Sequence, residues 1–384
     1  MPDRVLLTAL LAIVAAGAAR GDEEPSLKEL VPAGMLIGAA LNQAQSDGQD
    51  DTALRIVTRH FNTVTAENLL KWENVHPEPD RYEFGPADRY VAFGHDRGLK
   101  VIGHTLLWHQ QTPAWVFEGK DGALPDRETL LNRLRTHIEA VAGRYRGRIH
   151  GWDVVNEALE EDGTLRKSPW LQAIGEDYIE KAFELASQAD PDAELYYNDF
   201  NLTKPEKRAG ALRIVRRLRD RGLRVDGIGE QGHWLMDVPA VDDIDRTIAD
   251  FTAAGMKTLI TELDVDVLPR DPSMYGADLN AKAKMRVETN LYPDGLPAAQ
   301  QEQQAKRYAD VFGVFMRHRG QIVRVTFWGV TDAQTWLHNF PIPGRVNHPL
   351  LWDRSGRPKP AFDAVVRTLK NARDEAAAAE GTVR

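Results

Sequence analysis

Two stretches decide the fold of this chain, Trp152-Asp153-Val154-Val155-Asn156-Glu157 and Thr261-Glu262-Leu263-Asp264-Val265. Each has the apolar, β-branched pattern of a buried parallel strand that presents a carboxylate at the edge of a sheet. Cleavage of a glycosidic bond needs one carboxyl group to protonate the departing oxygen and another to stabilise or attack the anomeric carbon. A pair of strand-end glutamates therefore indicates a glycosidase.

Similar runs rich in Val, Ile and Tyr recur along the whole chain. They predict eight strands, at 35–41, 61–65, 101–107, 149–155, 194–198, 227–231, 258–263 and 323–328. Amphipathic segments between them predict helices, among them 130–145, 176–188, 204–221 and 300–317. This order predicts an α/β fold, a closed (β/α)8 TIM barrel forming a single catalytic domain. An open doubly wound sheet is disfavoured, because Gly38-Ala39-Ala40-Leu41 lacks the glycine spacing of a nucleotide-binding turn.

The composition of the chain disfavours several classes of binding partner and chemistry. The 384 residues carry a formal net charge of -9, which disfavours binding to nucleic acid or an anionic membrane and suits a neutral polymer. The sequence has no cysteine, which excludes disulfides, thiolate chemistry and cysteine-ligated metals. We expect a monomer that uses no cofactor.

The chain ends carry their own signals. Arg4, the apolar run 5–14 and the small residues 15–19 have the three parts of a secretory signal, so residues 1–21 are predicted to be a signal peptide. The catalytic domain is expected over 22–373, and the Ala/Glu-rich end 374–384 is expected to be a frayed helix or flexible tail. The protein is predicted to be secreted, extracellular or periplasmic, with no membrane contact after signal cleavage.

Polar and aromatic residues follow the predicted strands, at the edge where a barrel of this kind carries its active site. Singly, each has an ordinary structural explanation, such as a core tryptophan or half of an ion pair. Together, so many polar groups at buried positions would be costly unless a ligand or solvent met them. Sugars combine hydroxyls with flat C–H faces, which suits a site of amides, charged groups and tryptophans.

The chain resembles glycoside hydrolase family 10, the endo-β-1,4-xylanases, from about Leu30 to Leu369. The motifs that carry the resemblance are 61–68 (FNTVTAEN), 103–109 (GHTLLWH), 152–157 (WDVVNE), 229–234 (GEQGHW), 261–264 (TELD) and 326–329 (TFWG). The resemblance implies hydrolysis of internal bonds of xylan and xylo-oligosaccharides. An Asn-Glu pair after strand four with a Glu after strand seven is also typical of other barrel glycosidases, including cellulases and mannanases.

The resemblance implies a retaining double displacement in which Glu157 is the general acid/base and Glu262 the nucleophile. Such a mechanism places the two carboxyl groups roughly 5 to 5.5 Å apart. We expect Glu157 to hold a proton at rest while Glu262 stays charged. His233 is expected to hydrogen-bond Glu262, and Asp264 to orient that histidine.

The resemblance also implies substrate contacts. Asn156 is expected to hold the sugar 2-hydroxyl with help from Gln231, and Trp328 and Trp336 to wall the site. The remaining expected substrate-binding residues are Glu67, Asn68, Lys71, His104, Trp108, Asn198 and Phe200. An ion pair between Glu67 and Lys71 remains a structural alternative. The resemblance further implies a non-proline cis peptide at His104-Thr105.

Two features depart from the family pattern. Phe200 stands where many members have a tyrosine that stacks on a leaving-group sugar, so we expect stacking without the hydroxyl contact. The connection 266–297 is long, and such loops are usually functional or mobile. Its Asp266, Asp271 and Asp278 fit no recognised calcium loop, and no metal is assigned.

Two other functions stay open at this point. One is a retaining barrel glycosidase that prefers β-1,4-glucan or cello-oligosaccharides, and the other is a carbohydrate-binding barrel without catalysis. Xylose lacks the hydroxymethyl group of glucose, so bulky side chains such as Trp328 and Trp336 would exclude glucose by steric clash. A binding protein would have little reason to keep both glutamates together with His233 and Asp264.

Overall fold

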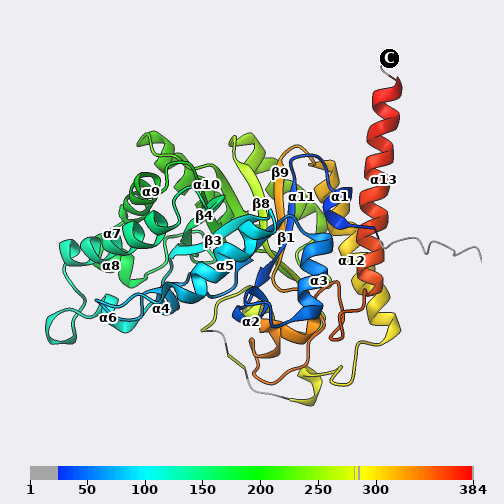
Figure 1. The fold of residues 1–384 in the computed structure, drawn as a ribbon, viewed down its shortest axis with the longest axis horizontal. Helices are drawn as coiled ribbons and strands as arrows, with labels where there is room; N and C mark the ends of the chain where they lie inside the picture. The colour runs from blue at the N-terminus through cyan, green and yellow to red at the C-terminus, as the bar shows by residue number, and fades with distance from the viewer. Residues whose placement is uncertain (1–24, 281, 284–285, 383–384) are drawn as a thin grey trace, which may run out of the picture.

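The computed structural model describes residues 25–280, 282–283 and 286–382 (Figure 1). The predicted signal peptide lies outside the described residues. Within them, eight parallel strands close into a barrel, each hydrogen-bonded to the next: β1 (Leu36–Leu41), β2 (Thr63–Ala66), β3 (Lys100–Leu107), β4 (Gly151–Asn156), β5 (Glu194–Asp199), β6 (Gly227–Glu230), β8 (Lys257–Asp266) and β9 (Ile322–Phe327). Pairing of Leu36 in β1 with Arg324 in β9 closes the circle. The predicted TIM barrel is confirmed.

Helices surround this barrel (Figure 1). The longer ones are α3 (Asp51–His60), α5 (Phe84–Asp96), α7 (Arg127–Arg144), α9 (Tyr178–Ala189), α10 (Pro205–Asp220), α11 (Val241–Ala253), α12 (Ala298–Arg317) and α13 (Pro360–Thr382). Shorter ones are α1 (Leu27–Leu30), α2 (Gln43–Ser46), α4 (Trp72–Val75), α6 (Ala114–Phe117) and α8 (Pro169–Ile174), with 3-10 turns at Lys120–Gly122, Pro272–Met274, Val287–Thr289, Asp332–Gln334 and Trp336–His338. Within the described part of the chain, no helix combines the length and apolarity needed to cross a membrane.

Local chemistry explains where the helices begin. The Asp50 side chain accepts the backbone N–H of Ala53 at the start of α3, and Asp126 accepts that of Thr129 at the start of α7. Pro205 opens α10, at the position where its missing N–H costs no helical hydrogen bond. Residues 374–382, for which the sequence predicts a frayed helix or flexible tail, continue α13, whose end extends beyond the barrel in Figure 1. The flexibility of this end stays a prediction.

The barrel strands are almost wholly buried because helices cover their outer faces and side chains fill the interior. At the strand ends this regularity breaks. The β3–β4 register shifts between His104 and Leu107, and the β4–β5 register shifts between Asp153 and Val155. A short strand, β7 (His233–Leu235), adds to the end of β8 with His233 opposite Asp264. Such irregularities re-aim side chains, and these lie beside the candidate site.

Candidate active site

A cavity of about 210 Å³ opens at the carboxyl ends of the strands. Twelve residues of the predicted site line it: Glu67, Asn68, Lys71, His104, Trp108, Asn156, Glu157, Gln231, His233, Glu262, Trp328 and Trp336. They come from the carboxyl ends of different strands and from the connections that follow them, so only the closed barrel brings them together. The lining is completed by Gln111, Ala277 and Leu279, which no sequence motif marks as site residues.

Glu157 follows β4 in a left-handed conformation, with φ of 58°. Its backbone N–H donates to the Asn198 carbonyl at 2.9 Å, which holds this unusual turn against the neighbouring strand. Trp108 Nε1 donates to one carboxylate oxygen at 2.9 Å, and Gln231 Nε2 donates to the other at 3.0 Å. Burial, reinforced by the negative charge of Asp199, raises the pKa of Glu157 from its usual 4.5 to about 7. Glu157 is therefore protonated in mildly acidic solution.

Glu262 lies in the opposite electrostatic environment. Asn198 Nδ2 donates to it at 2.8 Å, and His233 Nε2 lies 3.2 Å from its other oxygen. Burial opposes its ionisation, but the His233 hydrogen bond and the charges of His104 and His233 prevail and lower the pKa of Glu262. The two carboxyl groups therefore hold different protonation states at the same pH, as the chemistry of a glycosidase requires.

His233 bridges two carboxylates. Its Nδ1 lies 3.0 Å from Asp264, which also accepts the Trp336 indole N–H at 2.7 Å. Burial alone would lower the pKa of His233, but the charge of Asp264 and its hydrogen bond raise it to about 9. The imidazole is thus protonated at neutral pH and donates from both nitrogens, one toward Glu262 and one toward Asp264. Asp264 lies behind the cavity and acts on it through this ring.

Amide side chains join the two glutamates. Asn198 Nδ2 donates to the Asn156 side-chain oxygen at 2.9 Å as well as to Glu262, and Asn156 Nδ2 donates to Glu157 at 3.3 Å. Thr261 Oγ1 in turn donates to the Asn198 oxygen at 2.6 Å. Asn198 thus lies beneath the cavity rather than in its lining, where it orients both Asn156 and Glu262. Its expected contact with substrate stays a prediction.

Lys71 anchors the opposite side of the cavity. Its ammonium donates to Asn68 at 3.0 Å and to Gln111 at 2.7 Å, and it lies 4.9 Å from the centre of the Trp108 ring. Burial lowers the pKa of Lys71 and raises the pKa of Glu67. These polar groups face a cavity sized for a small ring, as expected for recognition of sugar hydroxyls.

His104 and the two tryptophans form the walls. His104 Nδ1 lies 3.0 Å from Asp153, and the peptide bond between His104 and Thr105 is cis, as predicted. The Trp328 ring stands edge-on to His104 at 5.3 Å, and Trp336 stacks on Phe340 at 4.5 Å. Ring packing thus holds Trp328, whereas Trp336 is held both by ring packing and by its hydrogen bond to Asp264.

Phe200 is buried and does not present the stacking face that its place in the sequence predicts. The residue is only 3% exposed and does not line the cavity. The Lys207 ammonium lies 3.5 Å from the centre of the ring. The backbone of Gly276, from the long connection after β8, lies against the ring, where an added Cβ would be 2.7 Å from a ring carbon.

The three aspartates considered for calcium have other partners. Asp266 forms buried ion pairs with Arg270 and Arg345, which leaves its charge satisfied. Asp271 accepts hydrogen bonds from Ser273 in its own turn. Asp278 pairs with Arg166 and accepts a hydrogen bond from Gln110. These contacts place the three carboxylates in separate structural roles.

The three lining residues that no sequence motif marks, Gln111, Ala277 and Leu279, lie in loops. Gln111 has φ of 44° and lies just beyond the His104-Trp108 stretch, in a left-handed turn whose direction the sequence pattern does not show. Ala277 and Leu279 belong to the connection 266–297, whose length was the one signal that it contributes to function. Neither residue has a polar group that would have marked it as a candidate.

The fold and this pair of carboxyl groups define a barrel glycosidase. The sequence profile of glycosyl hydrolase family 10 matches residues 26–368. The chain belongs to glycosyl hydrolase family 10.

Named relatives agree with this assignment. The chain is similar to endo-1,4-beta-xylanase A of Xylanibacter ruminicola, with 41% identity over 91% of this chain and 95% of the relative. It is also 41% identical to an endo-1,4-beta-xylanase of Geobacillus stearothermophilus, over 89% of this chain and 98% of the relative. The solved structure of a GH10 endoxylanase from a sugarcane soil metagenome superposes with a TM-score of 0.84 at 40% identity, covering 90% of this chain and 99% of that one.

Proposed function

We propose that this protein is a secreted endo-β-1,4-xylanase that hydrolyses xylan and xylo-oligosaccharides with retention at the anomeric carbon. The observation that carries the proposal is the contrast between Glu157, protonated up to about pH 7, and Glu262, held ionised by His233 and Asn198. The names of the family relatives support xylan as the substrate. Export rests on the predicted signal at residues 1–21.

The contacts define two steps. In the first, a Glu262 oxygen attacks the anomeric carbon while the Glu157 proton passes to the departing sugar oxygen, so the glycosidic bond breaks and a glycosyl ester forms. In the second, Glu157, now ionised, takes a proton from water as the water oxygen attacks that carbon and releases Glu262. Loss of the Glu262 charge in the ester favours the ionised form of Glu157, which suits its change from acid to base.

Preference for xylose over glucose is assigned to the tryptophan walls. Trp336 is held by its hydrogen bond to Asp264 and by stacking on Phe340, so it cannot move aside without breaking both contacts. A hydroxymethyl group on the sugar would have to compete with such a wall. Comparison of kcat/KM for xylotetraose and cellotetraose tests this preference, and a larger value for cellotetraose would favour the β-glucanase alternative.

Proton NMR during hydrolysis of xylohexaose tests the reaction itself. Early appearance of the β-anomer in internally cut products, before mutarotation, is the expected result for a retaining endo-xylanase. Early α-anomer would exclude the covalent mechanism. Binding of xylohexaose without turnover would instead support a carbohydrate-binding barrel.

A further inference from the structure

The leaving-group side of the cavity is built from a loop rather than from an exposed aromatic ring. Glu157 protonates the departing oxygen, so under the proposed function the leaving-group sugar must lie next to Glu157. Phe200, the aromatic residue expected to stack on that sugar, is buried beneath Gly276 and contacted by Lys207. A sugar therefore meets something other than this ring.

The residues that replace it belong to the segment 275–279, which we call the cover segment. Ala277 and Leu279 line the same cavity as Glu157. Gly276 has φ of 110°, a conformation that side-chain-bearing residues rarely adopt, and this allows its backbone to lie flat on the Phe200 ring. The cover segment thus presents two aliphatic side chains where a stacking platform was expected.

Hydrogen bonds and an ion pair hold the cover segment in place. Asn201 Nδ2 donates to the Tyr275 carbonyl at 3.1 Å, and Arg270 donates to the Gly276 carbonyl at 2.9 Å. Asp278 accepts from Gln110 Nε2 at 3.2 Å, and its other oxygen lies 3.5 Å from the Arg166 guanidinium. Among these contacts, the ion pair of Asp278 with Arg166 is the one that joins the segment to the connection after β4.

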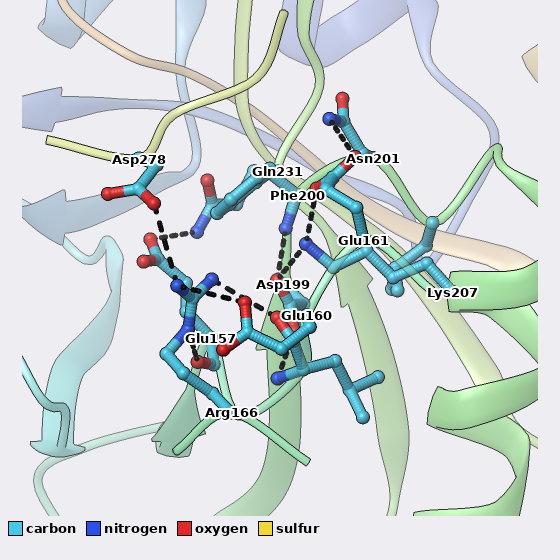
Figure 2. Close-up of polar contacts among 12 residues, drawn as sticks. Glu157, Glu160, Glu161, Arg166, Asp199, Phe200, Asn201, Lys207, Gln231 and Asp278 are labelled. Carbon is cyan, nitrogen blue, oxygen red and sulfur yellow. Dashed lines mark hydrogen bonds and ion pairs between the residues drawn. The ribbon is translucent and has the colours of Figure 1, made fainter. Parts of the chain in front are cut away.

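Arg166 also contacts the acid/base residue directly. Its Nε donates to the Glu157 carbonyl at 3.1 Å and a terminal nitrogen donates to the Leu159 carbonyl at 3.1 Å, while Glu160 lies 3.7 Å away. Figure 2 shows the guanidinium between Asp278 on one side and Glu157 and Glu160 on the other. One side chain therefore fixes both the backbone of the proton donor and the position of the cover segment.

We propose that the cover segment is the leaving-group-side recognition element of this enzyme, with Leu279 contacting the first leaving-group sugar and Asp278 positioning it through Arg166. This rests on the proposed function. An aliphatic surface offers a sugar dispersion contacts without the stacking of an aromatic ring, so binding on this side depends on how closely Leu279 is held. Asp278 is accordingly a positioning residue and Leu279 a specificity-determining residue.

The test separates substrates with and without a leaving-group sugar. We expect Asp278→Ala and Leu279→Ala each to lower kcat/KM for xylopentaose by about tenfold, the scale of a lost apolar pocket contact. Hydrolysis of 4-nitrophenyl β-xylobioside, which places no sugar on that side, should change less than about twofold by the same reasoning. The matched control is Asp271→Ala, an exposed aspartate of the same loop that bonds only within its own turn, and it should change neither.

Leu279→Ala and one further variant, Phe200→Tyr, make the test more specific. Leu279→Ala keeps every anchoring contact, so it tests the sugar contact even if Asp278→Ala loosens the loop. Phe200→Tyr should leave the xylopentaose value unchanged, because no sugar reaches the buried ring.

Equal losses on both substrates, or losses on neither, in an enzyme whose wild type cleaves both would overturn this inference and leave the proposed function intact. A gain of xylopentaose activity in Phe200→Tyr would also overturn it. A wild type inert toward both xylosides would overturn the proposed function itself.

Discussion

At the scale of single residues, Glu157 and Glu262 show how identical side chains acquire different chemistry. Both are buried, which favours the neutral acid. Glu262 faces a protonated His233 and an amide donor, whereas Glu157 faces the negative charge of Asp199. The hydrogen bonds and charges around each buried carboxyl group therefore decide which of the two keeps its proton.

This contrast predicts the pH dependence of activity. The enzyme needs Glu157 protonated and Glu262 ionised, so kcat/KM should fall as pH rises through about 7 and as pH falls below 4.5, the usual pKa of a glutamate. A bell-shaped profile measured with xylotetraose between pH 3 and 9 is the check. A profile still rising at pH 8 would contradict the assignment of Glu157.

Asp264→Asn should move only one side of that profile. Asparagine can keep one oxygen toward both His233 and Trp336, so the shape survives while the charge that raises the pKa of His233 is lost. Wherever the lowered pKa leaves His233 neutral, Glu262 loses the positive charge that keeps it ionised, so its pKa rises and the acid limb should move to higher pH. The alkaline limb, assigned to Glu157, is the internal control and should stay in place. Movement of both limbs together would point to a general structural effect.

At the scale of elements, the strands could be predicted because each joins an apolar interior to a polar end. The runs 227–231 and 323–328 differ from β6 and β9 by a single residue at one or both ends. The predicted end of β2, at residue 65, lies one residue before the observed end at Ala66. Strand β8 runs three residues past its predicted end, to Asp266, because β7 pairs there. A three-residue strand such as β7 has too little sequence to show a period.

The loops could not be predicted in the same way. The positions of Leu279 and Gln111 depend on contacts between distant segments, such as Asp278 with Arg166 and Lys71 with Gln111. Burial of Phe200 likewise follows from the path of the connection after β8. Local sequence patterns record periodicity within an element, whereas these positions arise from tertiary contacts that no local pattern contains.

Strand β6 tests whether element packing supports catalysis. A Cβ at Gly229 would lie 2.3 Å from the Asn198 side-chain oxygen and 2.8 Å from Thr261, so Gly229→Ala must displace the amide that orients Asn156 and Glu262. We expect kcat on xylotetraose to fall by about tenfold or more and stability to fall by about 1–3 kcal/mol. The matched control is Gly313→Ala in α12, where a Cβ meets nothing within 4 Å. That variant should keep full activity and gain up to about 1 kcal/mol.

At the scale of the whole molecule, the barrel holds the catalytic groups in place. Burial of ionisable groups in turn lowers the stability of the barrel at pH values where those groups would be charged in the unfolded chain. Buried histidines set the acid side of stability. Burial lowers the pKa of His60 to about 4 and of His109 to about 3, below the usual 6.5. Their contribution to stability is present above pH 6.5 and is lost as pH falls toward those values. Heating curves should therefore show a lower Tm at pH 4 than at pH 6.

Glu157, the catalytic acid, contributes to the change in stability as pH rises above neutrality. The folded pKa of Glu157, about 7, lies above the 4.5 of an unfolded glutamate, so its contribution to stability is fully present below pH 4.5 and is lost as pH rises through about 7. Glu230, buried and also raised to about 7, acts in the same direction. The Tm of the wild type should therefore fall between pH 6.5 and pH 8, where the histidine contribution no longer changes.

The Glu157→Gln variant separates the effect of the catalytic carboxyl group on stability from that of the rest of the fold. Glutamine carries no ionisable proton, so the variant should gain stability relative to the wild type as pH rises, by about 2–3 kcal/mol between pH 5 and pH 8. Because Glu230 remains, the variant should still lose some stability between pH 6.5 and pH 8, where the histidines no longer change, and Glu157→Gln combined with Glu230→Gln should lose less. Thermal unfolding of the three proteins at matched pH values checks this order. A Tm for Glu157→Gln that runs parallel to the wild type would mean that Glu157 ionises in the folded protein as readily as in the unfolded chain, and the proton it needs for catalysis would have to be held in another way.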